Sequence, residues 1–368
     1  MTQPHTILLG TRKGLFVVRG AGKDWRIASH HFAGDPVSQL LADARDGAWY
    51  AAMNLGHFGV KLRKSLDQGA SWSEIAAPAF PPKPVEGPLA GDNTPWNVEM
   101  IWALEAGGAA QPGRLWAGCL PAGLFCSDDG GASWTLNRAL WEEPRRLFWS
   151  GGGYDHPGID SILVDPRDPR HVTLAVSTGG VWQTHDEGAS WALTADGMRG
   201  DYLPEGSQFE PNAQDVHKMV ACPSDPDTLW VQHHCGIYRS IDGAQSWQLI
   251  GPPAPSGFGF AVAVHPRDAK RAWFVPAKAD ACRIPVDAQL LVNRTSDGGA
   301  SFEQFREGLP QHHAYHLVYR HALEVAQDGT TLAMASTTGG LWVSSDSGER
   351  WQNLSRDLPP VAVLKFAV

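Results

Sequence analysis

Ligand-type side chains recur at one position of a short apolar segment that occurs seven times in the chain. Each segment has the length and the β-branched or aromatic content of a strand. The residues at the second position of the aligned segments are Ser38, Glu99, Asp160, His217, Ala261, His316 and Ala362. Carboxylates and imidazoles bind Zn²⁺, Mn²⁺ or Fe²⁺, and they also donate and accept protons without a metal. The pattern predicts a metal or acid–base centre formed by Glu99, Asp160, His217 and His316.

These residues can meet only if the seven segments surround one axis, and a longer repeat predicts that they do. The octapeptide SDDGGASW, Ser127 to Trp134, has six near-copies including itself, and a degenerate seventh ends at Trp25. The period is about 54 residues, and each unit has the pattern of four short strands joined by tight turns. Four antiparallel strands repeated radially predict an all-β, seven-bladed β-propeller, which we expect to be a single domain over residues 1–368.

The two ends of the chain predict how this ring closes. The first apolar segment, TILLGTRKGLFVV, begins at the second strand of a unit. The last segment, Val361 to Val368, has the pattern of a first strand. We therefore expect the C-terminal strand to complete blade one, which leaves no open sheet edge.

The octapeptide itself is interpreted as scaffold. Its aspartate can accept hydrogen bonds from the turn, its glycine can adopt a positive φ, and its aromatic residue can pack between blades. The pattern S/T-x-D-x-G-x-S/T-W resembles the Asp-box, or BNR, repeat of sialidases and of other propellers, among them sortilin-type receptors and a photosystem II assembly factor. The resemblance implies the fold and leaves the reaction open.

Sialidase activity is not expected from this resemblance. Sialidases have six blades and an Arg-Ile-Pro signature ahead of the first Asp-box. The one such tripeptide in this chain, Arg283 to Pro285, lies deep in the sixth unit. None of the six tyrosines has a context that matches the family's nucleophile.

Three consecutive inter-blade loops, roughly 76–96, 136–158 and 194–214, are unusually long and share the face opposite the octapeptides. Loops on a rigid scaffold commonly carry function, and an aromatic-lined cleft with a few charges suits a small organic ligand. The expected ligand-binding residues are Trp96, Arg145, Trp149, Tyr154, His156 and Lys218. Secondary candidates in turns on the same face are Asp155, His57, His233, His234, His312 and His313. The alternative is that these loops only pack on one another.

Charge and composition limit the possible partners. The net charge of −9 argues against nucleic acid, and no apolar run or basic amphipathic segment suggests a membrane. The first residues lack a signal-peptide pattern, and five cysteines without a CxxC pair fit reduced thiols. We therefore expect a cytoplasmic protein whose partner is a small-molecule ligand or another protein.

Two functions stay open at this point. One is a hydrolase or lyase that uses Glu99, Asp160, His217 and His316 in the central channel of the propeller, with or without one divalent metal. The other is a non-catalytic propeller for binding or assembly. A third possibility is that these channel residues only bind water. The convergence of carboxylates and imidazoles favours the enzyme, because a docking surface does not require such groups inside a channel.

Overall fold

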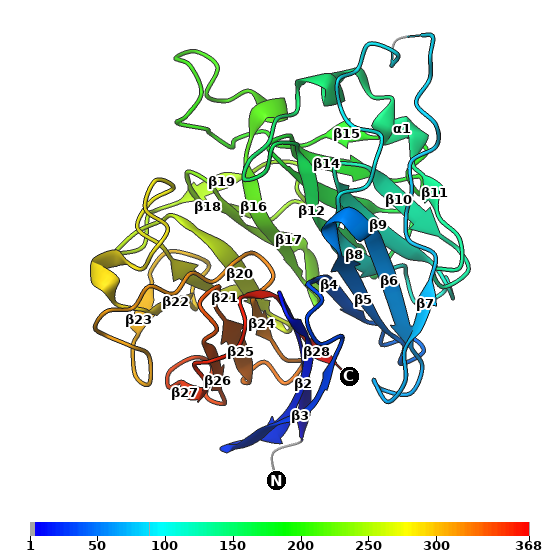
Figure 1. The fold of residues 1–368 in the computed structure, drawn as a ribbon. Helices are drawn as coiled ribbons and strands as arrows, with labels where there is room; N and C mark the ends of the chain where they lie inside the picture. The colour runs from blue at the N-terminus through cyan, green and yellow to red at the C-terminus, as the bar shows by residue number, and fades with distance from the viewer. Residues whose placement is uncertain (1–3, 88, 368) are drawn as a thin grey trace.

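Seven four-stranded antiparallel sheets surround one axis in the computed structural model, which describes residues 4–87 and 89–367 (Figure 1). Each sheet runs from an innermost strand at the axis to an outermost strand at the rim. The seven-bladed β-propeller predicted from the repeats is confirmed.

The first four blades are built as follows, from the innermost strand to the outermost. Blade one contains β28 (Val361–Ala367), β1 (His5–Thr11), β2 (Gly14–Ala21) and β3 (Asp24–His31). Blade two contains β4 (Val37–Ala42), β5 (Trp49–Asn54), β6 (Val60–Ser65) and β7 (Ser73–Ile75). Blade three contains β8 (Met100–Ala106), β9 (Leu115–Leu120), β10 (Leu124–Ser127) and β11 (Thr135–Leu136). Blade four contains β12 (Gly158–Val164), β13 (Val172–Ser177), β14 (Gly180–Thr184) and β15 (Ala192–Leu193).

The last three blades follow the same order. Blade five contains β16 (Val216–Cys222), β17 (Asp225–His233), β18 (Gly236–Ser240) and β19 (Gln248–Ile250). Blade six contains β20 (Gly259–His265), β21 (Asp268–Pro276), β22 (Val292–Thr295) and β23 (Glu303–Phe305). Blade seven contains β24 (Leu323–Val325), β25 (Leu332–Ala335), β26 (Leu341–Ser344) and β27 (Gln352–Ser355). Short helices in the loops are η1 (Gly56–Phe58), α1 (Arg138–Trp141), η2 (Pro144–Phe148), η3 (Pro211–Ala213) and η4 (Val286–Ala288).

The C-terminal strand closes the ring as predicted, over Val361–Ala367; Val368, the last residue of the predicted strand, lies outside the described residues. β28 pairs antiparallel with β1, so that Leu364 lies opposite Leu9. Leu364 is buried in an apolar cluster that joins blade one to Leu341 of blade seven. The two ends of the chain are therefore held in one sheet by backbone hydrogen bonds and by apolar packing against the neighbouring blade.

The octapeptides form the hairpins between the third and fourth strands, and their hydrogen bonds show why they recur. In blade three, Asp129 Oδ1 accepts from the Ser133 backbone N–H at 2.9 Å, and Oδ2 accepts from the Ser133 hydroxyl at 2.6 Å. The Ser127 hydroxyl donates to Asp129 and accepts from the Gly131 N–H. Gly131 has a φ of 89°, a value that favours glycine. The stretch is scaffold, as the sequence predicted.

Six of the innermost strands share a further feature, a β-bulge close to the loop-bearing face. One extra residue in each strand interrupts the pairing with the second strand. A bulge re-aims side chains, so consecutive residues can face the same side of a sheet. The residues at the bulges are Ser38, Trp102, Asp160, His217, Phe260 with Ala261, and Ala362.

All five cysteines are free thiols, in agreement with the reduced state expected from their number and spacing. In the part of the chain that the structure describes, no helix has the length and apolar character needed to cross a bilayer.

Closure of the ring gives a first test. Replacing Leu364 by alanine removes buried apolar contacts between blades one and seven, and should lower the free energy of unfolding by about 2–5 kcal/mol. The control Val85→Ala changes a side chain that is 92% exposed and should stay within about 0.5 kcal/mol of the unmodified protein. Urea unfolding followed by tryptophan fluorescence measures both. Equal stability of the two variants would contradict the role of β28 in closure.

Candidate active site at the mouth of the channel

The predicted ring of four ligand-type residues is only partly assembled. Asp160 and His217 occupy the bulges of blades four and five, as the alignment required. Glu99 does not, because the matching segment of blade three begins three residues later and places Trp102 at the bulge. His316 lies seven residues before β24, so it is not on the innermost strand of blade seven. The predicted set of Glu99, Asp160, His217 and His316 is therefore corrected.

The two displaced residues lie in other surroundings. Glu99 is partly exposed, and its Oε1 lies 3.8 Å from Nε2 of His156, which is also partly exposed. His316 contacts the hydroxyls of Ser336 and Thr338 and lines a separate groove of about 350 Å³ with Trp342 and Arg356. Neither residue joins Asp160 and His217.

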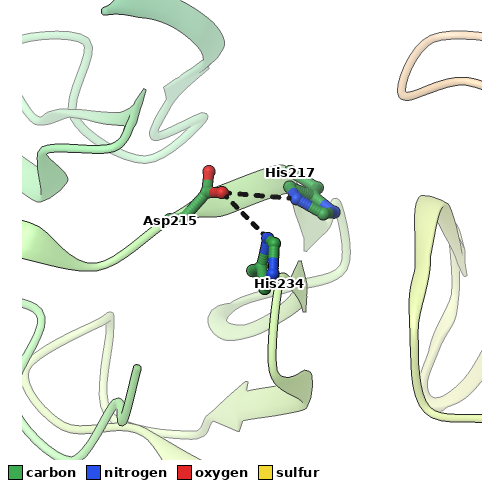
Figure 2. Close-up of side chains that lie close together, drawn as sticks. All are labelled: Asp215, His217 and His234. Atoms are coloured by element: carbon green, nitrogen blue, oxygen red, sulfur yellow. Dashed lines mark hydrogen bonds and ion pairs between the residues drawn. The ribbon is translucent and has the colours of Figure 1, made fainter. Parts of the chain in front are cut away.

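A different group converges beside His217. Asp215 Oδ2 lies 3.5 Å from Nε2 of His217 and 3.2 Å from Nδ1 of His234 (Figure 2). Within the described ranges this is the one group of three or more histidine, cysteine or acidic side chains whose ligand atoms all lie within 4.8 Å of one another. We refer to Asp215, His217 and His234 as the DHH cluster.

The backbone explains why these three residues meet. Asp215 directly precedes β16, and His217 is the bulged residue of that strand. His234 lies in the tight turn between β17 and β18, and its N–H donates to the carbonyl of Asp215 at 3.0 Å. The turn is thus fixed to the start of the innermost strand, on the face that carries the long loops.

Aromatic side chains fix the two imidazoles of the cluster. The ring of His217 stacks on Phe260 at a centroid distance of 4.5 Å. The ring of His234 contacts Tyr202 and Phe258 edge to face, at 5.1 and 5.6 Å. Because packed rings lose rotamer freedom, the cluster is held in one arrangement before any ligand arrives.

The DHH cluster has an ionised carboxylate. Burial raises the pKa of Asp215, but the neighbouring imidazoles of His217 and His234 and the charge of Arg320 outweigh it, so the pKa lies far below the ordinary range. The Ser177 hydroxyl donates to Asp215 Oδ1 at 3.1 Å. For His217, burial is the largest influence and lowers the pKa of the imidazole, which favours its neutral form.

Asp160 lies in the same channel, but the pKa of its carboxyl group is raised. It is fully buried, and its Oδ2 has no hydrogen-bond partner among the described residues. Burial raises the pKa of its carboxyl group to about 7, against the opposing effects of Arg320, the Ser161 hydroxyl and Lys218. The channel therefore holds one carboxyl group whose pKa is raised to about 7 and one whose pKa lies far below the ordinary range.

Arg320, and not His316, is the residue before β24 that contacts the bulges of other blades. It lies three residues before β24, and its guanidinium carbon is 4.7 Å from the ring of Trp102 and 5.3 Å from that of Phe260. These rings come from the bulges of blades three and six, so the cation reaches across the channel. Its Nη2 lies 3.5 Å from the Ser177 hydroxyl, which in turn donates to Asp215. The positive charge helps to keep Asp215 ionised.

Lys218 lies deeper in the channel and away from its mouth. Its Nζ is 3.2 Å from Nδ1 of His321 in blade seven. Burial, followed by the charge of Lys365, lowers the pKa of Lys218 to about 8. Lys365 in turn pairs with Glu324 at 3.7 Å. A second polar layer thus lies below the DHH cluster, and Lys218 belongs to it.

The side chains of the three long loops pack mainly on one another. Trp96 contacts Phe80 and Trp141, and Trp149 is buried against Trp182. Arg145 lies over the ring of Trp182 at 4.8 Å. These loops gather on one side of the ring (cyan and green in Figure 1), where Arg146 forms a buried ion pair with Asp92 at 2.6 Å. Trp96, Trp149 and Arg145 therefore contribute to packing within the loop layer.

Tyr154 is the predicted ligand-binding residue with the most open position. Its side chain is half exposed and contacts Trp102 edge to face at 5.2 Å. Tyr202, which contacts His234, is exposed to a similar degree. Both rings come from long loops and lie near cluster or channel residues, so they can border a ligand at the mouth.

Asp215 and Arg320 were missed by the sequence analysis, whereas His234 was a secondary candidate. The signal for Asp215 is its place directly before the innermost strand that carries His217. The signal for His234 is its place in the turn next to that strand. Nothing in the sequence places Arg320 in the channel, because it precedes an unusually short strand.

Comparison with known proteins gives distant relatives. No protein-family model matches the chain. An oligoxyloglucan-reducing end-specific xyloglucanase of Emericella nidulans is 24% identical over 230 residues, which is 60% of this chain and 26% of that enzyme. A xyloglucanase of Paenibacillus sp is 25% identical over 203 residues, covering 51% of this chain and 19% of that enzyme. The chain thus spans about a quarter or less of the length of these relatives.

Solved structures agree on the fold. An ancestral GH74 enzyme superposes with a TM-score of 0.59 and 16% identity, over 90% of this chain and 38% of that one. YCF48 from Cyanidioschyzon merolae superposes with a TM-score of 0.53 and 14% identity, over 87% of this chain and 84% of that one. At these identities the likeness extends to the propeller architecture.

The pKa of Asp160 gives a test of the channel electrostatics. Because its pKa is raised in the folded state, the native protein holds a proton between about pH 4 and pH 7 that the unfolded chain has released. The stability due to Asp160 is therefore complete below about pH 4, is lost as the pH rises to about 7, and is constant above it. Burial is the main cause of the raised pKa of Asp160; the charge of Asp215 adds to it, and those of Arg320 and Lys218 oppose it.

An Asp160→Asn variant does not titrate at this position, so its stability should fall less steeply than that of the unmodified protein between pH 4 and pH 7. Urea unfolding of both proteins at intervals from pH 4 to pH 8 measures the difference. Parallel curves over the whole range would show that Asp160 is not protonated in the folded channel.

Proposed function

We propose that this propeller is a hydrolase whose water-activating groups are the DHH cluster at the loop-bearing mouth of the channel. The observation that carries the proposal is the convergence of a buried carboxylate and two imidazoles, held by backbone and aromatic contacts. A docking surface has no need of such a set, because these side chains face one another inside the molecule and not a partner outside it.

The distant relatives support a hydrolase in preference to a lyase. The Emericella and Paenibacillus proteins are both named as xyloglucanases, which makes a glycosidic bond the first one to examine. The half-exposed ring of Tyr202 provides an apolar face beside the cluster, and the half-exposed ring of Tyr154 lies against Trp102, as a small organic ligand requires. We infer in addition that the octapeptides are Asp-box repeats, that the ligand is a small molecule, and that the protein acts in the cytoplasm.

The positions of the residues suggest how the work is divided. Hydrolysis needs a group that takes a proton from water and a group that returns a proton to the leaving atom. His234 is the most exposed member of the cluster, with 24% of its side chain accessible, so it is the member that meets solvent and substrate. Asp215 orients both imidazoles, and Arg320 stabilises the ionised state of Asp215 from across the channel.

The test is a hydrolysis screen of the purified protein with chromogenic glycosides, esters and lactones. We expect turnover with at least one of these classes and a loss of about 100-fold or more in kcat/KM for Asp215→Asn. Asp357→Asn is the matched control, because it makes the same change at an exposed site, and it should leave kcat/KM unchanged. Folding of both variants is verified by circular dichroism.

Two results would contradict the proposal. Turnover that survives Asp215→Asn would place the activity elsewhere on the protein. No turnover of any of the three classes by folded protein would favour the non-catalytic binding or assembly propeller.

A further inference from the structure

We infer that the DHH cluster is a binding site for one divalent metal ion, for which Zn²⁺ is the best fit. The inference deepens the proposed function, since it names the cofactor of the same site and rests on that function for any role in catalysis. Metal binding itself is independent of catalysis and is tested separately. The ligand set differs from the one expected from the sequence: His217 is kept, Asp215 and His234 are added, and Glu99, Asp160 and His316 are left out.

The spacing of the ligand atoms suits a small tetrahedral ion. Metal–ligand bonds of about 2.0–2.1 Å and tetrahedral angles place ligand atoms roughly 3.4 Å apart. Asp215 Oδ2 lies 3.5 Å from His217 Nε2 and 3.2 Å from His234 Nδ1 (Figure 2). All three ligand atoms lie within 4.8 Å of one another. A cation of this size can therefore be held with only small movements of the side chains.

The hydrogen bond of His217 to the backbone determines which ring nitrogen faces the cluster. Nδ1 of His217 lies 2.6 Å from the carbonyl oxygen of Gly259, which can only accept. Nδ1 is therefore the protonated nitrogen, and in a neutral ring Nε2 presents a lone pair to the Asp215 carboxylate. Two electron-pair donors facing each other at 3.5 Å need a positive centre near both.

One cation can satisfy all three side chains together. The ligand atoms of Asp215, His217 and His234 lie within 4.8 Å of one another, so an ion between them contacts the carboxylate and both imidazoles.

The groups that hydrogen-bond to the three ligand residues have the arrangement found around metal centres. A metal-ligating histidine commonly donates its second ring N–H to a backbone carbonyl, as His217 does to Gly259. The carboxylate is hydrogen-bonded in turn, because Ser177 donates to Asp215 Oδ1 and leaves Oδ2 for the ion. The His234 N–H bond to the Asp215 carbonyl fixes two ligands to each other through the backbone.

The exposure of the ligands leaves one side of the site open. Asp215 and His217 are buried, whereas His234 is partly accessible from the loop-bearing face. Three protein ligands and one open position are typical of catalytic zinc sites, in which the metal lowers the pKa of a bound water to about 7. The chain's own part is to hold the three ligand atoms and to shape access past Tyr202 and Phe258.

The test uses full-length protein, purified without a histidine tag and dialysed against a chelator. Titration calorimetry with ZnCl₂ alone should give one site per chain. Affinity should fall by about 100-fold or more in His234→Gln, since removal of even an outer contact costs 10- to 100-fold. His316→Gln is the matched control, because this histidine lies in a separate groove, and it should bind zinc as the unmodified protein does. Asp215→Asn provides a second variant if His234→Gln is poorly folded.

The outcomes separate the metal site from the proposed function. Equal zinc affinity in the unmodified protein, His234→Gln and Asp215→Asn, or no binding to the unmodified protein, would overturn the metal site. Zinc binding that depends on the cluster, without hydrolysis of any substrate class, would support the site and contradict the hydrolase. Hydrolysis by chelated, zinc-free protein at the full rate would support the hydrolase and overturn a metal requirement.

Discussion

The β-bulge near the start of the innermost strands is the constraint on which the channel chemistry depends. In a regular strand, neighbouring residues point to opposite faces, so a strand at the axis offers the channel every second side chain. The bulge breaks this alternation. In blade five it lets His217 reach the cluster at the mouth while Lys218, the next residue, reaches His321 across the channel. One local irregularity thus lets two consecutive residues contact different polar groups.

The same bulge explains why the fold could be predicted from the sequence and the site only in part. The repeats, the four-strand units and closure by the C-terminal strand depend on apolar patterning and turn chemistry, which the sequence displays directly. The register of the innermost strands depends on where the extra residue lies. Alignment of apolar segments placed Asp160 and His217 correctly, but it placed Glu99 where Trp102 lies.

Blade seven shows a second physical limit of prediction. Its innermost strand has only three residues, Leu323–Val325, so the segment before it has no regular pairing that a periodic pattern could reveal. His316 was assigned to that strand and lies outside it, whereas Arg320 reaches the channel from an irregular segment. The ligand-binding prediction for Trp96 and Trp149 was based on the length and position of their loops and on aromatic content. Aromatic residues in long loops also bury themselves against each other, and that packing is not visible in sequence.

The two carboxyl groups of the channel show that position in the ring does not decide protonation. Asp160 and Asp215 are both buried and both experience the charge of Arg320. Asp160 has one hydrogen bond, from Ser161, and burial dominates its pKa. Asp215 has two imidazoles beside it, and together with the charge of Arg320 they outweigh burial. Groups whose pKa values are pushed apart in one site are the usual basis for dividing acid and base roles. In this propeller the division follows from the turn between β17 and β18, because that turn brings His234 to Asp215 and no equivalent residue to Asp160.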